Sequence, residues 1–307
     1  MPMLSTATNY AARDADIAIN SYTTVLRRPC VPHDLFATYW RDVHGPLCSR
    51  IPGLGWYVQV HLDREQDAHL WPALDGIAPF PDYELDGGVE IGFYSAADQA
   101  TFTEACPLLF ADEQNMFAAT VAYALPTGSV TLLDRVADPA PNEHDDLDRM
   151  HVHFGADPAD APAFRDRMHR LATALAAEAP VLRARLHLPN TYSNADPAPP
   201  APNVAHDVPD ERRCLAILDL AFASPLARRQ FYATPQFAAA TADLSAHVSH
   251  TTAFAVSGVY TYVRDKQLTL AGLRGSRPAQ LITQLGALNQ TSDDVRHLLL
   301  TNHLKPA

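Results

Sequence analysis

The feature that most constrains the fold is an ordered alternation of strand-like and helix-like segments in the first 138 residues. Residues 17–27 alternate in polarity and are rich in β-branched side chains, which is typical of a strand. Residues 32–48 place apolar side chains at helical spacing, and Gly45-Pro46 predicts the end of that helix. The other segments expected here are strands at 53–62, 87–94, 120–125 and 130–136 and a helix from Ser95 to about 110.

The same order returns after a polar, proline-bearing segment at residues 137–147. Ser95 precedes Phe102 by seven residues, and Ser224 precedes Phe231 by seven, an offset of 129 residues. The order β-α-β-β-α-β is that of the split ferredoxin-like unit, so the repeat predicts a duplicated unit. The elements expected in the second copy are strands at 150–154, 181–188, 214–222 and 252–263 and helices at 160–178 and 224–247.

We therefore predict an α+β protein of two tandem ferredoxin-like units, residues 1–138 and 146–265, followed by a C-terminal helical extension, residues 266–307. Each unit leaves one sheet face to be covered, and two copies can pack those faces together. The expected architecture is a pseudo-dimeric α/β barrel with a cavity between the sheets. Residues 189–211 hold many prolines without periodicity and are expected to be a loop insertion. The extension should form two short helices that pack on the domain or on a partner subunit.

The charge balance argues against several classes of partner. The chain has 23 basic and 35 acidic residues, a formal net charge of −12, and no cluster of Lys or Arg beyond pairs. Proteins that bind nucleic acids or anionic membranes normally present a basic face, so neither partner is expected. No stretch approaches 18 apolar residues and the N-terminus lacks the pattern of a signal peptide, so a cytoplasmic location is expected. The four cysteines form no C-x-x-C pair, which indicates neither a zinc ribbon nor a redox pair.

A motif at residues 39–59 (YWRDVHGPLCSRIPGLGWYVQ) combines Y-W-x-x-x-H-G-P with P-G-x-x-x-Y-x-Q. In this combination the segment resembles the EthD-like family of the dimeric α/β-barrel superfamily. The matching positions are Tyr39, Trp40, His44, Gly45, Pro46, Pro52, Gly53, Tyr57 and Gln59. The second unit has Ala172 at the position of His44 and lacks His-Gly-Pro. The resemblance therefore implies that the family's polar site is kept in the first unit alone.

The resemblance also implies a fold and a range of activities. Members of the superfamily build a barrel from two ferredoxin-like units, which a tandem chain would do by itself. Their activities include polyketide cyclisation, decarboxylation, cofactor-free oxygenation, lactone isomerisation and haem chemistry. The resemblance therefore implies a cavity but does not select one reaction.

His44 is the candidate catalytic residue. An imidazole titrates near neutral pH and can move a proton on a small aromatic or enolisable substrate. His44 also lies at the expected end of a helix, where a histidine can simply hydrogen-bond a free carbonyl and benefit from the helix dipole. The residues alone leave both roles open.

His151 and His153 form an H-x-H pair on a short predicted strand, so both side chains should point to one face. That geometry suits two metal ligands. However, no H-E-x-x-H motif or carboxylate triad completes a metal site, and the alternative is a pair that lines a cavity or faces water. We take the two residues as candidate substrate contacts and predict no bound metal.

Aromatic side chains on the predicted strands can line an apolar pocket for a flat ligand, with ordinary core packing as the alternative for each one. The chain has neither G-x-G-x-x-G nor G-x-x-x-x-G-K-[ST], and the G-x-x-D-G signature of haem relatives is broken because Tyr83 stands before Asp86 and Gly87. No cofactor is therefore predicted. The candidate substrate-binding residues are Trp56, Tyr57, Gln59, His151, His153 and Tyr260.

The sequence thus predicts a cofactor-independent enzyme that acts by proton transfer on a small aromatic or polyketide-like compound in the barrel cavity, with His44 as acid and base. Decarboxylation, cyclisation and dehydration are the reactions considered. The alternatives are a non-catalytic ligand-binding or accessory protein of a catabolic or biosynthetic pathway, and a haem or metal oxidoreductase. The expected partner is an apolar or aromatic small molecule, and the chain is compatible with a homodimer.

Overall fold

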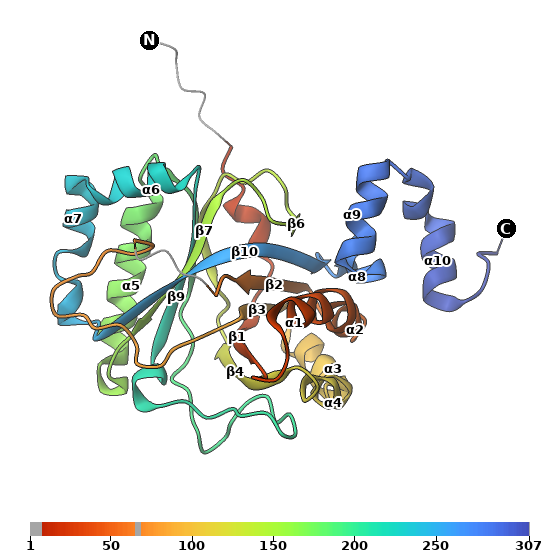
Figure 1. The fold of residues 1–307 in the computed structure, drawn as a ribbon, viewed down its shortest axis with the longest axis horizontal. Helices are drawn as coiled ribbons and strands as arrows, with labels where there is room; N and C mark the ends of the chain where they lie inside the picture. The colour runs from red at the N-terminus through yellow and green to blue at the C-terminus, as the bar shows by residue number, and fades with distance from the viewer. Residues whose placement is uncertain (1–7, 65–68, 307) are drawn as a thin grey trace, which may run out of the picture.

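The computed structural model describes residues 8–64 and 69–306, and its strands join into one large antiparallel sheet (Figure 1). The order along the sheet is β4-β1-β3-β2-β10-β7-β9-β8-β5, and β6 and β11 pair with β10. The α+β class predicted from the sequence is therefore confirmed. The strands are β1 (Ile19–Arg27), β2 (Trp56–Leu62), β3 (Gly87–Phe93), β4 (Phe117–Leu125), β5 (Val130–Asp134), β6 (Asn142–Glu143), β7 (Asp148–Gly155), β8 (Val181–His187), β9 (Leu215–Phe222), β10 (His250–Arg264) and β11 (Gln267–Leu268).

Two parts of the sheet have the same internal strand order. The first is β4-β1-β3-β2 and the second is β10-β7-β9-β8, so in each part the first and third strands of the segment lie at the centre. The 15-residue strand β10 pairs with β7 through its first residues and with β2 through its later ones, where Tyr260 lies opposite Gln59. The two parts are therefore one hydrogen-bonded sheet.

Helices cover one face of each part (Figure 1). The helices α1 to α4 lie on the first part and α5 to α7 on the second, while α9 and α10 lie apart at one end of the molecule. Within the described ranges, no helix has the length and apolar character needed to cross a membrane. The helices are α1 (His33–Tyr39), a π-helical turn (Trp40–His44), α2 (Gly45–Ser49), α3 (Ala96–Ala105), α4 (Pro107–Glu113), α5 (Ala161–Ala176), α6 (Pro225–Tyr232), α7 (Pro235–Thr241), α8 (Leu270–Arg274), α9 (Ser276–Leu285) and α10 (Asp293–Thr301).

The helices predicted to begin after Ser95 and Ser224 are present, and each is divided by a proline. Each serine side chain accepts a hydrogen bond from the backbone N–H three residues later, which caps the helix. Pro107 and Pro235 each begin a second short helix, because proline has no N–H with which to continue the helical ladder. The single long helices predicted at these places are corrected to the pairs α3–α4 and α6–α7.

Strand β5 stands at the opposite end of the strand order from β4, the strand that precedes it in the chain. A strand was expected here as part of the first unit, but β5 pairs with β8, so that Val130 lies opposite Leu186 at the far edge of the sheet. The segment 137–147, expected to be a plain linker, contains β6, whose Asn142 lies opposite Tyr260 of β10. Edge strands take whichever backbone the tertiary structure brings beside them, and no local pattern specifies that choice.

Both faces of the sheet are buried. Along β1, Val25 packs in the hydrophobic cluster beneath α1 to α4, whereas Tyr22 packs in a second cluster with Ile217 of β9 and Phe254 of β10. These strands are not neighbours of β1, so the sheet curves until its inner faces meet. A third cluster lies between α5 to α7 and the second part of the sheet. Because successive side chains of a strand point to opposite faces, a residue's place in this alternation decides whether its side chain lies beneath the helices or on the inner face.

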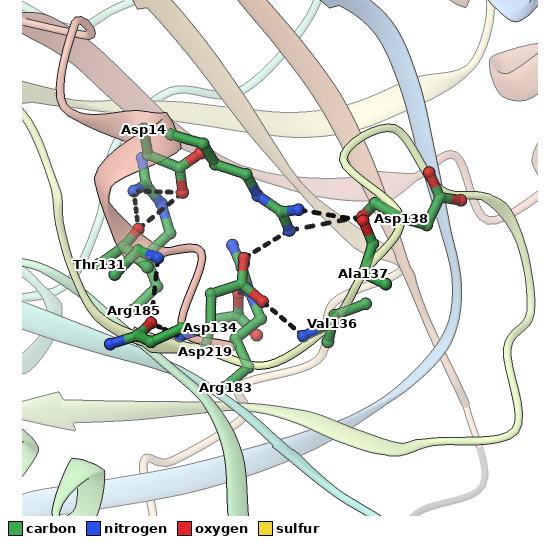
Figure 2. A network of polar contacts seen from close by, with 12 residues as sticks. Asp14, Thr131, Asp134, Val136, Ala137, Asp138, Arg183, Arg185 and Asp219 are labelled. Carbon is green, nitrogen blue, oxygen red and sulfur yellow. Dashed lines mark hydrogen bonds and ion pairs between the residues drawn. The ribbon is translucent and has the colours of Figure 1, made fainter. Parts of the chain in front are cut away.

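The inner face contains a buried network of charged side chains (Figure 2). Arg183 on β8 donates to Asp134 of β5 at 2.7 Å and to Asp219 of β9 at 2.6 Å. Arg185, also on β8, donates to Glu90 of β3 and to Thr131 of β5. Because β3 and β8 lie in different parts of the sheet, the pair of Arg185 and Glu90 links the two parts across the interior.

Arg185→Met should destabilise the protein by about 3–5 kcal/mol, because it leaves the buried Glu90 carboxylate without its cation. Urea unfolding followed by circular dichroism measures this change. The matched control is Lys266→Met, since the half-exposed Lys266 pairs with Asp98 at the surface and its loss should cost less than about 1 kcal/mol. An Arg185→Met variant as stable as the parent would contradict the proposed importance of this link.

Candidate functional site

His44 lies at the end of the π-helical turn between α1 and α2 and is 5% exposed. Its Nδ1 lies 2.8 Å from Oδ2 of Asp112, which α4 carries. The other oxygen of Asp112 accepts a hydrogen bond of 2.6 Å from the Tyr39 hydroxyl. Within the described part of the chain, His44 Nε2 has no hydrogen-bond partner. The result is an imidazole oriented by a carboxylate, with its second nitrogen free.

The π-helical turn has a specific chemical cause. In this turn a carbonyl accepts a hydrogen bond from the backbone N–H five residues later, as the Trp40 carbonyl does from the N–H of Gly45. Pro46 has no N–H to give to the Arg41 carbonyl, and the Tyr262 hydroxyl of β10 donates to that carbonyl instead, at 2.7 Å. Position 45, next to Pro46, requires glycine, because a Cβ atom at this position would clash with the Tyr262 ring.

Gln59 on β2 supports the same turn. Its Nε2 donates to the Trp40 carbonyl at 3.0 Å, and its Oε1 lies 3.1 Å from the Tyr262 hydroxyl oxygen. Gln59 was predicted as a substrate contact. The structure shows it fully buried and bonded to the helix that carries His44.

The carboxylate of Asp112 is held in its ionised form. Burial by itself would raise the pKa of this group, but the hydrogen bonds from His44 and Tyr39 outweigh burial and hold its pKa below the usual value. Burial and the hydrogen bond to Asp112 raise the pKa of Tyr39 to about 12, so this phenol stays protonated. Asp112 therefore accepts the hydrogen bonds of His44 and Tyr39, and a third from Asn115 at 3.2 Å, as an anion, which favours the His44 tautomer with its proton on Nδ1.

A cavity of about 130 Å³ lies between α1 to α4 and the first part of the sheet, and His44 lines it. The site was predicted in the barrel cavity between the sheets, whereas this cavity lies on the helix-covered side, because the helix that carries His44 packs on that side. An apolar cavity of about 150 Å³ can hold benzene, so this volume admits roughly one aromatic ring. Most of the lining is apolar or aromatic. The lining residues are Ser21, Thr23, Val25, Trp40, His44, Cys48, Tyr57, Val89, Ile91, Phe102, Cys106, Leu109, Phe110, Glu113, Phe117, Thr120, Ala122 and Pro199.

Glu113 is a second titratable group of this cavity. Burial raises its pKa to about 8, a hydrogen bond from the Thr120 hydroxyl at 3.3 Å opposes the shift, and the charge of Asp112 adds to it. At neutral pH Glu113 is therefore a carboxylic acid that can donate a proton. The cavity thus combines a neutral acid with an imidazole that is paired to an ionised carboxylate.

The structure separates the predicted site residues into two groups. Tyr57 lines the cavity with His44, whereas Tyr260 lies beside His61, with ring centroids 4.7 Å apart, and is not among the lining residues. Trp56 points to the inner face of the sheet, because successive strand residues point to opposite faces.

His151 and His153 also lie on the inner face. The Tyr22 hydroxyl oxygen is 2.7 Å from Nδ1 of His151 and 3.2 Å from Nε2 of His153. Burial lowers the pKa of both imidazoles, so both are neutral hydrogen-bonding groups. Among the described residues, no group of three or more His, Cys, Asp or Glu side chains is arranged to hold a metal ion.

Three residues of the candidate site were missed by the sequence analysis: Asp112, Glu113 and Tyr262. Asp112 and Glu113 are adjacent acidic residues near the end of the helix predicted from Ser95, and this pair was a usable signal for both. Tyr262 was grouped with other strand aromatics, and its hydrogen bond to a helix 221 residues away in sequence has no local signature.

The second part of the chain has no counterpart of His44. Ala172, the residue predicted at that position, is fully buried on α5. Phe164, Met168 and Leu171 of the same helix fill the space above the sheet, each with 0% exposure. This side of the second part is an ordinary apolar core.

Comparisons with known proteins yield distant structural likenesses. The sequence matches no family model and no curated protein, so the EthD-like resemblance stays a prediction. A candidate monooxygenase of Fusobacterium nucleatum is 7% identical over 82% of this chain and 95% of that chain, with a TM-score of 0.49. An anthrone oxidase-like protein is 9% identical over 83% of this chain and 96% of that chain, also with a TM-score of 0.49. A mutant of SnoaB, a cofactor-independent oxygenase from Streptomyces nogalater, is 16% identical over 41% of this chain and 98% of that chain, with a TM-score of 0.25.

Glu113→Gln should change how stability depends on pH. The pKa of Glu113 is about 8 in the folded protein against an ordinary 4.5, so the folded state holds this proton more tightly than the unfolded state does. The contribution of Glu113 to stability therefore falls as pH rises from about 4.5 to about 8, at up to about 1.4 kcal/mol per pH unit.

Urea unfolding between pH 5 and pH 8 measures this effect. Glu113→Gln should lose stability less steeply with rising pH than the parent does. Glu104→Gln is the matched control, because Glu104 is exposed on α3 and its replacement should leave the slope unchanged. Parallel stability curves for the parent and Glu113→Gln would show that Glu113 is ionised at neutral pH.

Proposed function

We propose that the cavity beside His44 is the active site of an enzyme that acts by proton transfer on a small, largely apolar aromatic or polyketide-like compound, without a cofactor. The observation that carries the proposal is the hydrogen bond of 2.8 Å between His44 and Asp112 at the wall of an apolar cavity. A volume of about 130 Å³ favours a reacting portion of about one ring. Decarboxylation, cyclisation and dehydration all need an acid–base step of this kind.

His44 acts first as the base. Asp112 accepts the proton on Nδ1, so the lone pair of Nε2 is available to remove a proton from an acidic C–H or O–H of the substrate. The imidazolium that forms is stabilised by the ionised Asp112, which Tyr39 keeps oriented. In the next step the imidazolium returns the proton to another atom of the product.

Glu113 acts on the charge that develops on the substrate. As a neutral acid it can donate a hydrogen bond to an enolate or phenolate oxygen, and the buried surroundings strengthen that bond. Two groups with different protonation states thus serve one cavity: an imidazole that takes the proton and a carboxylic acid that stabilises the anion.

We also infer that the chain is a tandem duplication of a ferredoxin-like unit, related to the EthD-like family, in which the first copy kept the polar site. The matching strand orders β4-β1-β3-β2 and β10-β7-β9-β8 support this inference. The paired helix caps Ser95 and Ser224 support it as well. The second copy then serves as a scaffold that completes the sheet.

His44→Gln should lower kcat/KM for a reactive substrate by about 10²–10⁴, and Asp112→Asn should lower it through loss of the oriented tautomer. A panel of one-ring phenols, 1,3-diketones and aromatic acids in D₂O reveals proton abstraction as deuterium incorporation, followed by NMR. Dissociation constants from calorimetry should change little in His44→Gln. His33→Gln is the matched control, because His33 lies on α1 away from the cavity lining.

Two outcomes would contradict the proposal. Binding of these compounds without exchange or turnover would identify a ligand-binding protein, the alternative kept from the sequence. Equal turnover by His44→Gln and the parent would remove His44 from the reaction. Oxygen uptake recorded in the same assays would show whether the carbanion is oxygenated after proton abstraction.

A further inference from the structure

The C-terminal arm, defined here as residues 270–306 with α8, α9 and α10, exposes an unusual number of leucines. In Figure 1, α9 and α10 extend away from the sheet at the end opposite α6 and α7. Leu285 is 83% exposed and Leu288 is 80% exposed, so these side chains lie almost entirely in solvent. Monomeric proteins rarely leave contiguous apolar surface of this kind uncovered. The exposed leucines of the arm are Leu281, Leu285, Leu288, Leu298, Leu299, Leu300 and Leu304.

These exposed leucines are here called the leucine face of the arm. The protein's own body, residues 8–64 and 69–269, does not cover the leucine face, because α9 contacts the body through its opposite side. Ser276 and Ala279 of α9 are buried, and the Arg277 backbone N–H donates to Asp42 Oδ1 at 2.7 Å. At 100° per residue, Leu281 and Leu285 point away from those two buried positions. The arm is therefore anchored on one side and apolar on the other.

The charge of the arm differs from that of the body. The arm has four basic and two acidic residues, which give it a net charge of +2. The whole chain has a net charge of −12, so the residues outside the arm carry a net charge of −14. Within the described residues none of the arm's arginines, Arg274, Arg277 and Arg296, forms an ion pair. The arm thus presents leucines beside unpaired positive charges.

A surface with the complementary properties exists on the same chain. The helices α1 to α4 expose Leu35, Val43, Leu47 and Leu108, of which Leu35 is 59% and Leu108 is 64% exposed. Asp34 and Glu104 are exposed on the same helices. This surface, here called the helix layer, is apolar with acidic neighbours.

We propose that the leucine face of the arm docks on the helix layer of a second copy of this chain, and that the partner's arm docks in return. A two-fold axis makes the exchange reciprocal, so both apolar surfaces of both copies are covered. Charge favours this occupant, because the arm at +2 is attracted to a body at −14, whereas two arms facing each other would repel. The proposal does not depend on the proposed enzymatic function.

The full-length protein at micromolar concentration tests the proposal by light scattering coupled to gel filtration. We expect a mass of twice 33.5 kDa. The arm variant Leu281→Glu with Leu285→Glu and the helix-layer variant Leu35→Glu with Leu108→Glu should both be monomers with parental thermal melting. Leu226→Glu is the matched control, because Leu226 is 63% exposed on α6, outside both surfaces, and this variant should remain a dimer.

Mixing the two monomeric variants distinguishes reciprocal exchange from contact between arms. The arm variant keeps an intact helix layer and the helix-layer variant keeps an intact arm, so a mixture should form a weaker heterodimer through one interface.

Several results would overturn the proposal. A monomeric parent, a dimer that survives either pair of substitutions, or a mixture that stays monomeric would each exclude the exchange. Co-sedimentation of a monomeric parent with phosphatidylglycerol vesicles would assign the leucine face to a lipid surface instead.

Discussion

The pairing of β10 with both β7 and β2 is the constraint on which the rest of the structure depends. This one strand joins two four-stranded segments into a continuous sheet, and the curvature of the sheet brings the inner faces together. The central strands then have two buried sides with different requirements. The side beneath the helices takes apolar residues, while the inner side holds charged and aromatic groups that must find partners there. The ion pair between Arg185 and Glu90 satisfies that demand and links the two parts.

The candidate site depends on the same strand. Tyr262 of β10 bonds the Arg41 carbonyl that Pro46 leaves without a donor, and Gln59 of β2 bonds the Trp40 carbonyl. These two contacts support the irregular turn that directs His44 toward Asp112. Removal of a helical N–H by proline is normally destabilising, but here side chains from the sheet replace the missing donor.

The sequence was informative about elements and less so about their partners. The caps at Ser95 and Ser224, the loop at 189–211 and the two short C-terminal helices were predicted from local patterns. The pairing of β5 with β8 was not, because strand partners are chosen over long distances. Trp56 and Tyr57 were both predicted to contact substrate. Neighbouring strand residues point to opposite faces, and the face of each was undecided until the sheet formed.

The sequence by itself determined the α+β class and the repeated order of elements, because these follow from spacing and capping. The helix predicted to end at Gly45-Pro46 instead continues through α2 to Ser49, because the π-helical turn accommodates Pro46, so His44 lies within the helical segment and not at its end. The tertiary structure alone decided that Asp112 orients His44, that Glu113 is buried as a neutral acid, and that His151 and His153 lie on the other side of the sheet. Those properties arise from contacts between segments distant along the chain and from the loss of water around them. No local pattern of residues specifies either the contacts or the burial.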